Sequence, residues 1–182
     1  LVGSDALDLA TWALSGDALD AAIGIAALNA LSQTLMTNLP AEGYSVHSGK
    51  DALDVLPLNE DSRMVLIGAF ASYLKRLKAL PVRLSLFELN PAALREDERH
   101  FWRPNEKMPE ILAEADGVIV TGATLVNRTF DDILRMTRPE AKVVLTGPTA
   151  SLFPMPFFEA GVTAMAGIRV KDAMLLLDLV SR

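Results

Sequence analysis

Cysteine is absent from this chain of 182 residues, and only two histidines, His47 and His100, are present. Without thiols the protein cannot form disulfides, use a thiolate nucleophile, or hold zinc or an iron–sulfur cluster through cysteine. The absence is compatible with a reducing cytoplasm. Any metal held by this chain would have to rely mainly on oxygen ligands, which suit hard cations.

Basic residues are also scarce. The chain has 17 Lys and Arg against 23 Asp and Glu, a net charge of −6. Nucleic-acid binding relies on clustered Lys and Arg, so we expect no nucleic-acid partner. The densest basic segment, residues 75–78, is typical of the last turn of a helix, where cations complement the helix dipole.

No uninterrupted apolar run approaches the roughly 20 residues that cross a bilayer. The first twelve residues, LVGSDALDLATW, lack the basic and apolar regions of a signal peptide. We therefore expect a soluble cytoplasmic protein with no membrane partner. Apolar residues still make up 51% of the chain, which is enough for one substantial core.

Short apolar runs alternate with helical segments after residue 63. This pattern predicts right-handed βαβ crossovers, and therefore an α/β, Rossmann-like open parallel sheet with helices on both faces. We expect the strand order 2-1-3-4-5, with 3-2-1-4-5 as the alternative. Strands are predicted at 64–67, 82–87, 117–120, 142–145 and 162–170, and helices at 72–80, 106–114, 129–137, 157–159 and 171–180.

A further helix is predicted at 17–36, capped by Asp17 or Asp20. Gly24 within it costs about 1 kcal/mol relative to Ala, which indicates that another backbone approaches closely there. Asn29, on the same helix, is either an exposed polar residue or a buried amide with a fixed partner, and we expect the exposed position.

The polar residues that could bind a ligand follow the predicted strands directly. Ligands of open α/β sheets bind at the carboxyl ends of the strands, so these residues are expected to surround one cleft. The loop after the third strand, within 117–129, is especially rich in hydroxyl and amide groups. The candidates are Gly68 after strand one, Glu88 and Asn90 after strand two, Thr121, Thr124 and Asn127 after strand three, and Gly147 and Thr149 after strand four.

Gly68 and Glu88 are spaced like the glycine and acid of a Rossmann dinucleotide site. However, residues 68–73 lack the second and third glycines of that motif, and Phe70 stands where backbone must approach a pyrophosphate. An ordinary NAD or FAD site is therefore not expected, and Gly68 is predicted to be a tight-turn glycine.

The loops after strands three and four differ in charge. The helix after Thr129 carries Asp131 and Asp132 in its first turn, so a phosphate would meet like charge there. Thr129 and Asp132 are expected to form a variant of the capping box. The loop 146–151 has several hydroxyls and no acid, so it either cradles an anionic or polyol ligand or simply makes a turn.

Common catalytic motifs are absent: there is no G-x-S-x-G elbow, P-loop or H-E-x-x-H helix. Glu88 is the best candidate for a titrating carboxylate, because it ends a buried strand and is partly desolvated there. It could equally cap neighbouring backbone N–H groups. His100 stands in a charged loop as a weaker candidate base, and Lys171-Asp172 is predicted to cap the last helix.

Several of these segments resemble a known family. They are similar to the uncharacterised prokaryotic family labelled as a "putative heavy-metal chelation" domain. The resemblance implies two parts, residues 1–60 as an N-terminal helical remnant of a small enolase N-terminal-like domain and 61–182 as a Rossmann-like domain, with a site in the cleft between the two kinds of domain. The matching segments are 21–30, Glu88-Leu-Asn-Pro91, 115–129, Thr146-Gly-Pro-Thr149 and 161–172.

The leading hypothesis is that a metal, a metal chelate or another polar small molecule binds at the strand ends. Glu88 and Asn90 would be oxygen ligands of a metal, and Glu88→Ala would abolish ligand binding while leaving thermal unfolding nearly unchanged. A metabolic enzyme with Glu88 as acid or base, aided by the loop 121–127, is one alternative. A non-catalytic subunit that forms a homodimer through its apolar N-terminal helix is the other.

Overall fold

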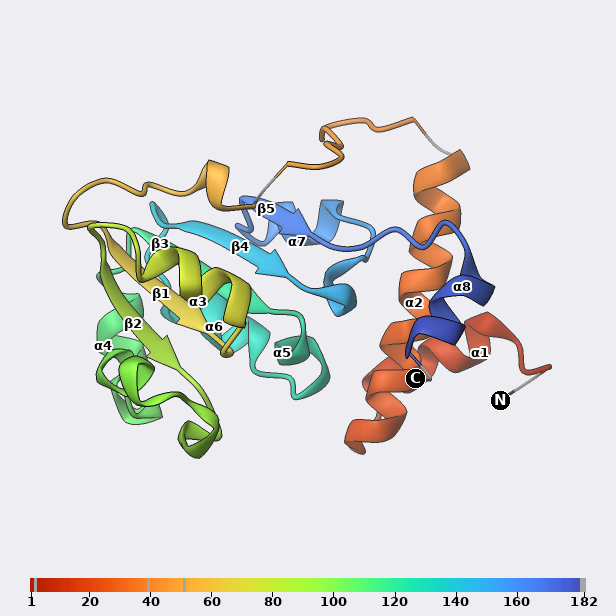
Figure 1. Cartoon of the computed structure of the whole chain (residues 1–182). Helices are drawn as coiled ribbons and strands as arrows, with labels where there is room; N and C mark the ends of the chain where they lie inside the picture. Colours follow the sequence, from red (N-terminus) through yellow and green to blue (C-terminus); the bar gives the residue numbers. More distant parts are fainter. Residues whose placement is uncertain (2, 39, 51, 181–182) are drawn as a thin grey trace.

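The computed structural model describes residues 1, 3–38, 40–50 and 52–180. Five parallel strands form one sheet in the order β2-β1-β3-β4-β5, which confirms the predicted order (Figure 1). The strands are β1 (Arg63–Ile67), β2 (Arg83–Phe87), β3 (Gly117–Thr121), β4 (Lys142–Thr146) and β5 (Ala164–Ala166).

The fifth strand lies within the predicted segment 162–170, but it is shorter than that segment. β5 pairs only with Val144, Leu145 and Thr146 of β4. The next residue, Gly147, has a φ of 110° and turns the β4 chain away. Beyond Ala166 the fifth strand therefore has no ladder partner.

Helices cover both faces of the sheet. α3 (Ala71–Leu77) and the 3₁₀ turn η2 (Ala52–Val55) contribute to one layer of the core, while α4 (Met108–Leu112), α6 (Phe130–Met136) and α7 (Met155–Glu159) contribute to the other. The connection from β3 to α6 contains a short helix, α5 (Ala123–Val126), where the sequence predicted only a loop. The remaining turns are η1 (Trp12–Leu14), η3 (Pro91–Ala93), η4 (Glu96–Phe101), η5 (Asn105–Lys107) and η6 (Pro148–Ala150).

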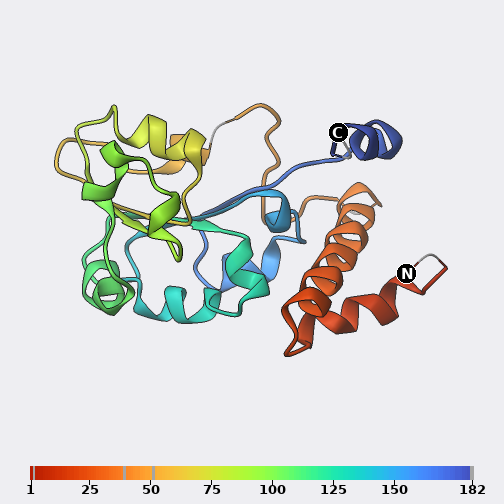
Figure 2. The ribbon, with the colours of Figure 1, turned by 60° about the horizontal axis from the view of Figure 1, so that its bottom comes forward.

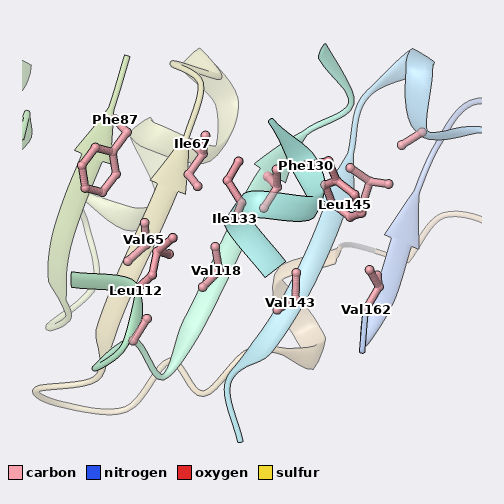
Figure 3. Packing of buried hydrophobic residues seen from close by; sticks show 13 residues of the cluster. Val65, Ile67, Phe87, Leu112, Val118, Phe130, Ile133, Val143, Leu145 and Val162 are labelled. Atoms are coloured by element: carbon pink, nitrogen blue, oxygen red, sulfur yellow. The ribbon is translucent and has the colours of Figure 1, made fainter. Parts of the chain in front are cut away.

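Alternate residues of the central strands enter opposite halves of the core, as the two-residue period of a strand requires. In β1, Val65 and Ile67 face the α4 and α6 side, whereas Met64 and Leu66 face the α3 side. All four are at most 6% exposed. Figure 3 shows the first of these two layers, with side chains from four strands packed under the helices.

The N-terminal segment forms a helical hairpin of α1 (Ala6–Thr11) and α2 (Ala18–Asn38). Asp17 caps α2 through its carboxylate, which accepts hydrogen bonds from two backbone N–H groups at 2.8 and 3.1 Å. A Cβ built on Gly24 would lie 1.9 Å from the backbone nitrogen of Ala13. The predicted close approach of another backbone at Gly24 is confirmed.

The helix α2 also contacts the loops at the carboxyl end of the sheet, beside α5 and η6 (Figure 2). Asn29 donates a hydrogen bond from Nδ2 to the carbonyl of Thr149 at 3.3 Å, and Gln33 donates to the carbonyl of Ser151 at 3.2 Å. Asn29 is half-buried. The expectation that it is exposed is therefore wrong, because α2 packs on the β4 loop.

Within the described residues, α2 is long and apolar enough to cross a membrane by length and composition, with a mean hydropathy of 1.3. The helix meets this criterion although it contains no uninterrupted apolar run of that length, because Asn29 and Gln33 break the run but leave the average high. A core helix of a soluble protein or a signal sequence meets the same criterion. Length and composition alone therefore assign no membrane segment here.

Candidate functional site

A cavity of about 500 Å³ lies at the carboxyl ends of β1, β2 and β3, on the α4 and α6 side of the sheet. The chain leaves β1 toward β2 on one side, and β3 lies on the other, so the cavity is at the point where the strand order reverses. This is where open α/β sheets bind ligands. The cavity is lined by residues 67–70, 87–89, 105, 108, 121, 123, 124, 127, 129, 132, 133 and 136.

Five of the eight predicted site residues line this cavity, namely Gly68, Glu88, Thr121, Thr124 and Asn127. They come from three separate loops that the sheet brings to one edge. The other three, Asn90, Gly147 and Thr149, do not line it.

Gly68 makes the tight turn after β1, with a φ of 89°. A Cβ at this position would lie 2.9 Å from Cγ2 of Thr121. The glycine therefore lets the β1 and β3 loops touch at the cavity edge, as its predicted role as a turn glycine requires. Phe70 follows and contributes an aromatic ring to the lining.

The carboxylate of Glu88 accepts hydrogen bonds from backbone groups of two loops at the edge of the cavity. One carboxylate oxygen accepts a hydrogen bond from the N–H of Ala69 at 2.9 Å, and the other accepts from the N–H of Asn90 at 3.0 Å. The indole N–H of Trp102 donates to the Glu88 carbonyl at 3.1 Å. Glu88 thus joins the β1 and β2 loops, which is the capping role that the sequence left open.

The β3 loop is held by its own side chains. Oγ1 of Thr121 accepts from the N–H of Ala123 at 3.2 Å, and the Thr124 hydroxyl donates to the Thr121 carbonyl at 2.6 Å. Oδ1 of Asn127 accepts from both the N–H and the hydroxyl of Thr129, at 3.2 and 2.7 Å. The Nδ2 group of Asn127 makes no hydrogen bond within the described part of the chain.

The predicted capping box at the start of α6 is wrong. The Thr129 side chain makes no capping hydrogen bond to the helix. Its hydroxyl binds Asn127 instead, because the residue has φ −94° and ψ −8° rather than the extended backbone of a typical N-cap. Asp132 therefore remains at the cavity, where it pairs with Arg135 one turn along α6.

The loop after β4 packs against the helix α2. The carbonyls of Thr149 and Ser151 accept the hydrogen bonds from α2, and a Cβ on Gly122 would lie 2.8 Å from Thr149. The Ser151 hydroxyl donates to the carbonyl of Pro148. The sequence left two roles open for this loop, a ligand cradle and a turn. These contacts match the turn, and the packing against α2 is an additional role.

Neither histidine lines the cavity. His100 is exposed, and its ring lies 3.8 Å from the ring of Phe101. His47 is also exposed and contacts the hydroxyl of Ser45 at 3.0 Å.

Sequence reasoning missed the wall that α4 and α6 contribute. The connection from β2 to β3 must cross β1 in the predicted strand order, so it has to pass over this part of the sheet. That order was a sufficient signal for placing α4, although not its individual side chains. The lining residues on α4, α6 and the residues just before these helices are Asn105, Met108, Thr129, Asp132, Ile133 and Met136. The other lining residues that were not predicted are Ile67, Ala69, Phe70, Phe87, Leu89 and Ala123.

A protein-held heavy metal does not fit these residues. In the described part of the chain, no group of three or more His, Cys, Asp or Glu side chains is placed to hold a metal ion. Both carboxylate oxygens of Glu88 already accept backbone hydrogen bonds, and the Asn90 side chain lies outside the cavity lining. Soft metals also prefer sulfur and nitrogen ligands to the oxygens found here.

Comparison with known proteins identifies relatives across the chain. A family model described as "Putative heavy-metal chelation" matches residues 51–182, and a second model with the same description matches residues 1–32. An uncharacterized protein of Methanocaldococcus jannaschii is 30% identical over 164 residues, which cover 87% of this chain and 58% of that protein. The chain therefore spans less than two thirds of that relative's length.

Two crystal structures of proteins of unknown function have the same fold. The protein from Pyrococcus horikoshii is 26% identical, with a TM-score of 0.76 over 97% of this chain and 67% of its own. The protein from Desulfitobacterium hafniense is 23% identical, with a TM-score of 0.75 over 98% of this chain and 68% of its own. The second likeness supports the fold alone.

Proposed function

We propose that the cavity of this chain, which belongs to the family described as "Putative heavy-metal chelation", binds a small organic molecule, either alone or as the chelator of a metal. One observation carries the proposal. Five predicted residues from three loops line one cavity of about 500 Å³ at the switch point of the sheet. Small-molecule pockets commonly have volumes of roughly 300–1,000 Å³ and occur at such points.

The lining supports an organic ligand more than a bare ion. Nine of the 17 lining residues have apolar side chains, and the seven polar ones belong mainly to the segments that follow β2 and β3. Such a surface suits a ligand with an apolar body and a small number of hydrogen-bonding groups. A metal would then bind as part of a chelate, with most of its ligands supplied by the chelator.

Ala123→Phe is expected to remove a co-purifying ligand from this cavity. Ala123 is exposed at the cavity, so a phenyl ring there takes up ligand space without disturbing the buried core. Native mass spectrometry with elemental analysis of gently purified protein would measure the retained organic molecule and metal. We expect occupancy to fall at least about tenfold, because a blocked pocket loses most of its ligand contact.

Ala113→Phe is the matched control. Ala113 is also exposed, but it lies at the end of α4 outside the cavity lining. The ligand occupancy of the Ala113→Phe variant should match that of the unmodified protein. A ligand retained equally by the Ala123→Phe variant would contradict the proposal. An organic molecule without metal would identify simple metabolite binding, and an equimolar metal would identify a chelate.

The enzyme alternative has weaker support. An acid or base must be able to exchange a proton with a substrate. In this structure the carboxylate of Glu88 is held between two backbone N–H groups. The contacts of Glu88 therefore favour positioning of the loops over proton transfer.

A homodimeric subunit is the second candidate function, and exposed leucines favour it. Leu7 of α1, Leu14 and Leu19 are at least 67% exposed, and Leu177 of α8 (Ala173–Val180) is 59% exposed. Figure 2 shows α8 standing clear of the sheet. Exposed apolar side chains that cluster on a surface commonly mark an interaction site, so these leucines are the residues at which to test for a dimer contact.

Leu177→Glu is expected to shift the protein from dimer to monomer, because a carboxylate would lose its water at an apolar interface. Light scattering coupled to size-exclusion chromatography would measure the mass over a range of concentrations. Val46→Glu is the control, since Val46 is 71% exposed on a loop away from these helices. A monomer for the unmodified protein at all concentrations would remove this candidate.

A further inference from the structure

We propose that the cavity selects a neutral or positively charged organic ligand with an apolar body, and rejects ligands rich in phosphate or carboxylate. This inference rests on the proposed function, because it names the class of molecule that the same cavity would take. It follows from the charges, the apolar walls and the free polar groups of the lining.

The charged residues of the lining are both acidic. Glu88 and Asp132 line the cavity, and its lining includes no Lys, Arg or His among the residues that the structure describes. The N–H groups bound to Glu88 are neutral dipoles, so its negative charge remains. Arg135 pairs with Asp132, but both side chains are more than half exposed, and water screens that pair strongly.

Nearby cations are held away from the cavity by other partners. Lys107 pairs with Glu110 at 3.0 Å. Arg103 donates to the carbonyls of His100 and Trp102. Neither Lys107 nor Arg103 lines the cavity, so an anionic ligand would meet the carboxylates of Glu88 and Asp132, of which Asp132 is paired with Arg135 on the exposed side of α6.

The start of α6 does not offer an anion site either. Phosphates commonly bind at helix N-termini, where free N–H groups and the dipole attract negative charge. Here Asp131 and Asp132 occupy the first turn. The backbone N–H of Thr129 is bound to the Thr124 carbonyl and to Asn127.

The walls accommodate a sizeable apolar body. Ile67, Phe87 and Ile133 belong to the buried core and line the cavity, and Figure 3 shows Ile67 and Phe87 on the strands and Ile133 on α6. Met108 and Met136 add flexible thioether side chains that adapt to irregular shapes.

Neutral polar groups complete the recognition. Asn105 and Asn127 both line the cavity and are exposed. The Asn105 amide can donate to and accept from a ligand, whereas Asn127, whose Oδ1 accepts from Thr129, offers its Nδ2 group as a donor. The Thr121 hydroxyl accepts from Ala123 and keeps its own hydrogen for a ligand acceptor. The lining thus admits a metal only as the centre of a neutral or cationic organic complex.

Three dansyl probes with one aromatic body and different charges test this selection. Dansyl-ethylenediamine is a cation at neutral pH, dansylamide is neutral, and dansylglycine is an anion. Fluorescence titration of the full chain is expected to show that the cation binds roughly tenfold more tightly than the anion, with the neutral probe between them. Ala123→Phe should abolish the binding of all three.

Asp132→Asn is expected to reduce the cation-to-anion affinity ratio roughly threefold. Asp131→Asn is a matched control, because it removes the same charge from the same helix turn at a position outside the cavity lining. The control should leave the ratio unchanged. An equal effect of both substitutions would overturn the assignment of Asp132 as a selecting group.

The outcomes separate this inference from the proposed function. Binding that Ala123→Phe abolishes, but with equal affinities or a preference for the anion, would overturn the charge selection and leave the ligand cavity standing. Absence of any binding that Ala123→Phe removes would overturn both. A cation preference sensitive to Ala123→Phe and Asp132→Asn would support both.

Discussion

Gly24→Ala is expected to destabilise the protein by about 2 kcal/mol or more, even though alanine is the better helix former. Intrinsic propensity alone would stabilise the helix by about 1 kcal/mol. However, the new Cβ would lie 1.9 Å from the backbone nitrogen of Ala13 and 2.5 Å from the carbonyl carbon of Trp12. Backbone atoms cannot move aside as the end of a side chain can, so overpacking outweighs helix propensity and lowers the free energy of unfolding.

Chemical denaturation and thermal unfolding would measure the loss, which corresponds to roughly 4–8 °C in Tm for a chain of this size. Hydrogen exchange should rise in α1 and α2 first, because the substitution pushes the two helices apart. Gly16→Ala is the control, since a Cβ at Gly16 meets no atom within 4 Å. A more stable Gly24→Ala variant would mean that the two helices do not pack as described.

The same glycine shows how far sequence reasoning reaches. Gly24 interrupts an otherwise good helix, and that local cost was enough to predict a close neighbour, although not that Ala13 is the neighbour. The strand order was predictable because apolar runs and crossover handedness leave few topologies. Local signals of this kind depend on residues close together in the chain.

Two of the features that sequence reasoning missed depend on residues far away in the chain, and a third depends on a side chain two residues away. Asn29 is half-buried because α2 packs on a loop about 120 residues away, to which it donates a hydrogen bond. The fifth strand is short because its partner β4 ends at Thr146, just before Gly147 turns the chain away. Thr129 fails to cap its helix because Asn127 accepts its hydrogen. None of these outcomes is encoded in the propensity of the residue itself.

The candidate site also has features that could be predicted from the sequence and features that could not. The three loops at one sheet edge follow from topology, which is why Gly68, Thr121 and Asn127 could be predicted to share a cavity. The roles of individual side chains could not be predicted, because each depends on which backbone groups remain unpaired. Glu88 is the clearest case, since its two neighbours on the β1 and β2 loops determine what it does.

Glu88→Ala is therefore expected to lower both stability and ligand binding, which corrects the expectation that thermal unfolding would hardly change. The substitution removes the acceptor of two backbone N–H groups, those of Ala69 and Asn90. Hydrogen bonds to charged groups contribute about 1.5–3 kcal/mol each, but both N–H groups lie near solvent and can bind water. We expect a loss of about 2–3 kcal/mol, or roughly 4–12 °C in Tm.

Glu88→Gln separates the structural role of the side chain from its charge. The glutamine keeps the size and one carbonyl acceptor, so about half of the lost stability should return. Its affinity for dansyl-ethylenediamine should still fall roughly three- to tenfold, because the negative charge is gone, while that for neutral dansylamide should change little. Glu60→Ala, at an exposed turn outside the cavity, should alter neither stability nor binding. Equal losses for the cationic and neutral probes would show that Glu88 only shapes the loops.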